Sequence, residues 1–99
     1  MNTLLVIALL ITAFAAGCVT ACIGDSTIEV DLLKNGVSVL SAAIEIDSGD
    51  ADYAAVAGTV SSASVVAGDV LEVAITVTAG TGTLGEGVFA ALTLEEKAQ

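Results

Sequence analysis

The sequence contains no histidine, no tryptophan and no arginine, and only three of its 99 residues are aromatic. Without histidine, the usual general base beside a serine or cysteine nucleophile is missing. A Ser–Lys pair with Lys34 is formally possible, but Lys34 falls in a predicted turn and is expected to be solvated. The scarcity of aromatics disfavours glycosidase clefts and sugar-binding modules. We therefore expect no enzyme activity, no catalytic residues and no cofactor.

Positive charge is almost as scarce. Two Lys stand against twelve Asp and Glu, which gives a formal net charge of −10. Such a surface repels phosphate, so we expect no nucleic-acid binding, and attraction to an anionic membrane surface is disfavoured. We expect a well-solvated acidic exterior.

Ligands for a metal ion are also few. The two cysteines, Cys18 and Cys22, have no histidine to complete a zinc site. On one strand their Cα atoms would lie about 13 Å apart, too far for a disulfide, so we expect buried free thiols. One acidic loop offers the candidate calcium ligands Asp47, Asp50 and Asp52. Their spacing is not that of an EF-hand, and a solvated loop is the favoured interpretation.

Residues 4–23 form an uncharged run that could span a membrane, act as a signal or lie inside a β-sheet core. No Lys or Arg flanks the run, which disfavours both a signal and a membrane helix. The stretch Ala15-Ala16-Gly17-Cys18 resembles the lipobox of bacterial lipoproteins, although Ala15 stands where a larger aliphatic residue is usual.

We interpret this run as two strands, residues 3–14 and 18–23, with a break at residues 15–17. The first strand is apolar on both faces, so neighbouring subunits are expected to cover it. The predicted interface residues are Leu4, Val6, Leu9, Ile11 and Phe14.

From residue 27 onward, apolar and polar residues alternate, as is typical of half-buried strands. Asn35-Gly36 predicts a tight hairpin turn. Residues 70–78 and 88–95 predict the best-defined hairpin, with the glycine-rich residues 80–87 as a flexible connection and residues 96–99 as a polar tail. The whole pattern predicts one all-β domain over residues 1–99, an antiparallel β-sandwich or jelly roll of about six to eight short strands.

Four stretches resemble a family of small β-sandwich domains in structural proteins of tailed-phage virions. They are Phe14-Ala15-Ala16-Gly17-Cys18-Val19-Thr20-Ala21, Val30-Asp31-Leu32-Leu33-Lys34-Asn35-Gly36 with residues 38–40, Ala67-Gly68-Asp69-Val70-Leu71-Glu72-Val73, and residues 80–85 running into residues 88–94. The resemblance implies a capsid decoration, cement or fibre-associated protein. It also implies a homotrimer and brings no catalytic residues.

The expected function is therefore that of a structural virion protein on the capsid surface, which binds its own copies and a major capsid or fibre protein. One alternative is a bacterial cell-envelope protein, either lipidated at Cys18 or anchored by the apolar run, and only this alternative involves a membrane. Another is a pilin-like filament subunit whose apolar run is a packed helix.

Overall fold

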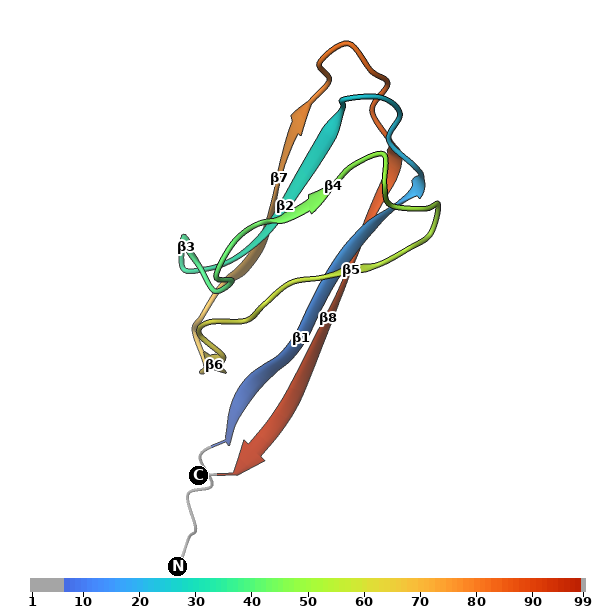
Figure 1. Cartoon of the computed structure of the whole chain (residues 1–99). Coiled ribbons are helices and arrows are strands. Elements are labelled where there is room, and N and C mark those ends of the chain that lie inside the picture. Colours follow the sequence, from blue (N-terminus) through green and yellow to red (C-terminus); the bar gives the residue numbers. More distant parts are fainter. Residues whose placement is uncertain (1–6, 99) are drawn as a thin grey trace, which may run out of the picture.

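The computed structural model describes residues 7–98, and within this range the chain forms eight β-strands and no helix (Figure 1). The strands are β1 Ile7–Thr20, β2 Thr27–Lys34, β3 Val37–Ser38, β4 Ile44–Ile46, β5 Val56–Ala57, β6 Ser64–Val65, β7 Leu71–Thr78 and β8 Glu86–Ala98. All strand pairs are antiparallel, and the strands form two sheets. The predicted all-β sandwich is confirmed.

The two sheets follow one plan. In the first, β1 is central, β8 pairs with it along its whole length, and the short strands β5 and β6 share its other edge. In the second, β2 is central, β7 pairs with all of it, and β3 and β4 share its other edge. The long strands β7 and β8 are therefore the edge strands of their sheets.

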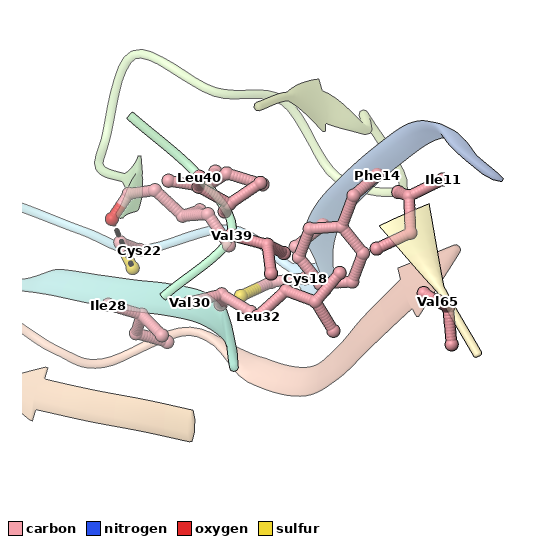
Figure 2. Packing of buried hydrophobic residues seen from close by; sticks show 13 residues of the cluster. Ile11, Phe14, Cys18, Cys22, Ile28, Val30, Leu32, Val39, Leu40 and Val65 are labelled. Carbon is pink, nitrogen blue, oxygen red and sulfur yellow. Dashed lines mark hydrogen bonds between the residues drawn. The ribbon is translucent and has the colours of Figure 1, made fainter. Parts of the chain in front are cut away.

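The core lies between the sheets, on the side that β3 to β6 close (Figures 1 and 2). Its largest fully buried side chains include Phe14 from β1 and Ile28, Val30 and Leu32 from β2. Val39 and Leu40, which follow β3, pack against them. The apolar alternation of β2 is thus explained, because its even-numbered side chains face the opposite sheet.

Residues 7–20 of the apolar run form one strand, β1, so the predicted break at residues 15–17 is wrong. Gly17 lies inside β1 and pairs with Phe89 of β8. A Cβ on Gly17 would lie 2.7 Å from the Phe89 ring and would also collide with the carbonyl oxygen of Ala54. Gly17 therefore marks a close approach of neighbouring groups within the strand, which is a common role of glycine in sheets.

The C-terminal strands do not form the predicted hairpin. β7 pairs with β2 and β8 pairs with β1, because each finds a long apolar partner that is remote in the sequence. The connection between them crosses from one sheet to the other. The predicted polar tail is also wrong for the described residues 96–98, since Glu96 and Lys97 extend β8 opposite Leu9 and Ala8.

The turn between β2 and β3 agrees with its sequence signal. Asn35 and Gly36 have φ angles of 53° and 85° and join β2 to β3 as a hairpin. These positive angles are those that an Asn-Gly hairpin turn requires.

The expected turn position of Lys34 is wrong. Lys34 is the last residue of β2, and its Nζ donates a hydrogen bond to the Ser64 carbonyl of the other sheet at 2.8 Å. Its ammonium group therefore links the two sheets by a hydrogen bond, whereas the sequence predicted a lysine surrounded by solvent.

Candidate functional site

On the side of the sandwich opposite β3 to β6, aliphatic side chains of two strands are exposed. On β7, Val73, Ile75 and Val77 are 45%, 50% and 54% exposed. On β8, Leu92 and Leu94 are 38% and 39% exposed. We call this set of five side chains the open side.

Strand register places the open side on the inner faces of both sheets. Val73, Ile75 and Val77 stand opposite the buried residues Leu32, Val30 and Ile28 of β2. Leu92 and Leu94 stand opposite the buried residues Phe14 and Ile11 of β1. Because directly opposite residues in an antiparallel pair point to the same face, the core surface of each sheet continues onto its edge strand. There nothing in the described part of the chain covers it fully.

A groove joins the two sheets at one end of the open side. Its volume is about 570 Å³, and it contains Leu71 of β7 and Leu94 of β8 on its walls. Leu9, Val65 and the turn that precedes β7 complete the lining. The groove is mainly aliphatic, with Asp69 as its single charged lining residue. It offers an apolar docking surface and no set of convergent polar groups for chemistry.

The predicted interface residues have different locations. Leu4 and Val6 lie outside the described residues, and Leu9 is half-buried in the groove. Ile11 and Phe14 are only 3% and 2% exposed, because they belong to the core of their own chain. These two side chains are therefore not available to an interface, whereas the five side chains of the open side on β7 and β8 are exposed.

The open side is also free of charge. The sequence has no charged residue in residues 73–85 or in residues 87–94, although the chain carries twelve acids. The acids that flank these stretches are Glu72, Glu86 and Glu95. An apolar, uncharged strip within a strongly acidic surface favours burial against another apolar surface.

The three candidate calcium ligands do not converge. The carboxylates of Asp47 and Asp50 accept hydrogen bonds from the backbone N–H groups of Gly49 and of Asp47, at 2.8 and 3.0 Å. Asp52 accepts a hydrogen bond from Ala21 N–H at 2.6 Å. Within residues 7–98, no three acidic or cysteine side chains are grouped as metal ligands. The acidic side chains of this loop instead stabilise its turns and its attachment to the end of β1.

Cys18 and Cys22 are free and buried in the core, as expected (Figure 2). Burial, followed by the proximity of Cys22, raises the pKa of the Cys18 thiol. A raised pKa disfavours the nucleophilic thiolate. The Cys22 thiol lies 3.8 Å from the carbonyl oxygen of Ile46, to which it donates a weak hydrogen bond.

The position of Cys18 also bears on the alternatives for the apolar run. Cleavage before Cys18 would remove residues 7–17 of β1, which include Ile11, Phe14 and Ala16 of the core. Lipidation of Cys18 therefore requires a fold other than the one described. The alternatives that make the run a helix are wrong for residues 7–20, which form β1. No helix that could span a membrane is found in the described range.

The glycine-rich connection between β7 and β8 is held by hydrogen bonds. Asp25 accepts bonds from the backbone N–H of Thr81 at 2.8 Å and from its hydroxyl at 3.2 Å. These bonds, the backbone bond first, lower the pKa of the Asp25 carboxyl. The backbone groups of Ile23 and Thr83 pair with each other at 2.9 and 3.0 Å. The connection is thus fastened to the turn between β1 and β2, and the flexible hairpin connection predicted for it is wrong.

Sequence reasoning missed the open side because it assigned β7 and β8 to each other. One signal was available in the sequence. Both strands alternate regularly, so each has an apolar face that needs a partner. Comparisons of the chain with models of protein families, with curated proteins and with solved structures found no match.

Proposed function

We propose that the chain is a structural assembly subunit that acts by binding copies of itself and neighbouring proteins of a larger shell or fibre. The observation that carries this proposal is the open side, on which five aliphatic side chains of two edge strands are 38% to 54% exposed. Long, uncharged edge strands invite pairing with another chain unless charges, proline or a covering segment block them. Neither β7 between Val73 and Thr78 nor β8 between Gly87 and Leu94 has such a block in its sequence.

The free energy gained by burying the open side is similar to the free-energy cost of bringing two chains together. Full burial of one aliphatic side chain stabilises by about 1.5 to 3 kcal/mol, so burial of the exposed halves of five gives roughly 4 to 7 kcal/mol per chain. Two such surfaces together give on the order of 10 kcal/mol, which is comparable with the roughly 4 to 15 kcal/mol that association costs. Side-chain burial therefore needs help from backbone pairing or from further partners.

The resemblance of this chain to virion domains gives the proposal its specific form. In that form the protein is a decoration, cement or fibre-associated subunit on a bacteriophage capsid, and its partners are its own copies and a major capsid or fibre protein. The formal charge of −10 fits an outward-facing position, because such a surface resists non-specific association. The resemblance favours a trimer, whereas the open side by itself fixes no number of copies.

The test is the mass of the purified full chain by light scattering at micromolar concentration. The proposal predicts a mass at least twice that of the 9.7 kDa chain. A monomeric mass would overturn self-association and with it the proposed function.

A further inference from the structure

The two strands that border the open side differ in their suitability for pairing with a second copy. On β8, the inner face carries Glu86 and Glu96 at its ends, because these residues share the even-numbered face with Leu92 and Leu94. On β7, the inner face contains Leu71, Val73, Ile75 and Val77 and no acid. Like charges directly opposite each other destabilise a strand pair, so the positions of these acids decide between the two edges.

Antiparallel pairing of two β8 strands places its acids unfavourably in each central register. A twofold axis at Ala91 puts Glu86 opposite Glu96 of the other copy. An axis at Ala90 puts Glu86 opposite Leu94, and an axis at Leu92 puts Glu96 opposite Val88. Each register therefore creates either repulsion or a carboxylate against an aliphatic side chain.

Pairing of two β7 strands has none of these conflicts. A twofold axis at Ile75 places Ile75 opposite its own copy and Val73 opposite Val77, all on the inner face. On the outer face, Ala74 stands opposite Thr76 and Glu72 stands opposite Thr78. Every inner-face contact is then aliphatic, and no two charges meet. β-Branched residues such as these also suit cross-strand packing.

We propose that two copies of this chain associate through β7, antiparallel and in the register that sets Val73 against Val77 across a twofold axis at Ile75. This inference rests on the proposed function, since it names the partner and the geometry of the self-association put forward there. A twofold β7 pair closes as a dimer, so it takes the place of the trimer that the resemblance favours. The second sheets of the two copies become one continuous sheet, and backbone hydrogen bonds add to the aliphatic burial. Such an interface is self-complementary, as twofold symmetry requires.

Charge and size both favour a second copy as the occupant. A basic partner would find no acid between residues 73 and 85, whereas another β7 matches this uncharged stretch. The eight residues of β7 extend about 26 Å, and a second β7 strand matches this length.

The register is tested with one added cysteine at a time in the otherwise unchanged full chain, which keeps its buried Cys18 and Cys22. The variants are treated with a mild oxidant and run on non-reducing gels. Opposite residues of an antiparallel pair lie about 4.5 to 5.5 Å apart between Cα atoms, within the reach of a disulfide. Ile75→Cys is expected to form a covalent dimer alone. Val73→Cys and Val77→Cys are each expected to stay uncrosslinked alone and to crosslink when mixed. The wild type and Val37→Cys, an exposed position on β3, are the controls.

Masses from light scattering separate this inference from the proposed function. Ile75→Lys would place two lysines together at the axis and is expected to reduce the dimer fraction at least tenfold at equal concentration. Val37→Lys makes the same change of charge on an exposed valine outside β7 and is expected to leave the mass unchanged. If the wild type is oligomeric but Ile75→Cys does not crosslink, or if Ala90→Cys crosslinks in its place, the β7 pairing is overturned and the proposed function stands. A monomeric wild type overturns both.

Discussion

Among the glycines in the strands of the first sheet, Gly17 is the one at which an added side chain would find the least space. It lies within β1 opposite Phe89, and the Phe89 ring and the Ala54 carbonyl occupy the volume where a side chain would project. A backbone carbonyl can yield only if its loop moves. The absence of a side chain at Gly17 therefore lets the loop that leads into β5 lie directly on β1.

Substitution of Gly17 by Ala is accordingly expected to destabilise the fold by about 2 to 3 kcal/mol, at the upper end of the usual cost of overpacking. The measurement is urea unfolding followed by circular dichroism. Ala13→Val, which adds bulk at an exposed position of the same strand, serves as the control and should change stability by no more than ~0.5 kcal/mol. Equal stabilities of Gly17→Ala and the wild type would show that the loop does not rest on β1.

Thr12 shows why the burial of β1 could not be predicted residue by residue. The strand has one extra residue between Ile11 and Ala13 relative to β8, so the inward-facing positions change from odd to even numbers. Leu9 and Ile11 face inward before this bulge, and Phe14, Ala16 and Cys18 after it. In a run that is apolar at nearly every position, no alternation marks the bulged residue. The expectation that neighbouring subunits cover this strand arose from that ambiguity.

Hydrogen bonds accepted by Asp carboxylates fix the connections between strands at both ends of the sandwich. At one end Asp25 holds the connection between β7 and β8 through Thr81. At the other end Asp69 accepts hydrogen bonds from Val66 N–H and from the Asn35 side chain, both at 2.9 Å. These bonds, that of Val66 first, lower the pKa of the Asp69 carboxyl. Each carboxylate joins turns from strands that are distant in the sequence.

Acid is expected to weaken the Asp25 connection. Because the pKa of this carboxyl is lowered in the folded chain, its contribution to stability is present above the unfolded-state pKa of about 3.9. That contribution is lost as the pH falls through the lower folded-state value. Asp25→Asn should therefore lower the midpoint of thermal unfolding at pH 6, and the difference from the wild type should shrink towards pH 2.

Glu29→Gln removes one charge from an exposed position on β2 and is the control for the change in net charge. A deficit of Asp25→Asn that is the same at pH 6 and pH 2 would contradict the assigned role of the carboxylate. The comparison uses the midpoint of thermal unfolding at both pH values.

The strands themselves could be predicted from local pattern, but the pairing of β7 and β8 could not. Alternation and turn signals identified both segments, and Asn35-Gly36 correctly predicted a hairpin. Adjacent strands often pair, and this tendency favoured a β7–β8 hairpin. The structure instead separates them, because the glycine-rich connection is fastened to the β1–β2 turn and directs β8 along β1. The β2–β7 and β1–β8 pairs join residues at least 37 positions apart, and such pairing depends on tertiary packing, which no local pattern records.

At the scale of the whole molecule, residues 7–98 close the sandwich on one side only. β3 to β6 lie on that side, as Figure 1 shows, and cover the core. On the other side, five inner-face side chains of β7 and β8 are 38% to 54% exposed. The acidic residues lie outside the uncharged stretches of both strands. This distribution combines a surface that repels non-specific partners with one strip that can be buried. It is the physical basis of the proposed assembly function.

Hydrogen–deuterium exchange of the wild-type chain tests this account most directly, because it reports whether the open side is covered in solution. The account predicts that, at micromolar concentration, the amides of β7 that point away from β2 exchange as slowly as those of β2 itself. They should exchange faster after dilution below the association range, while β2 stays protected. Fast exchange along this edge of β7 at every concentration would contradict the account.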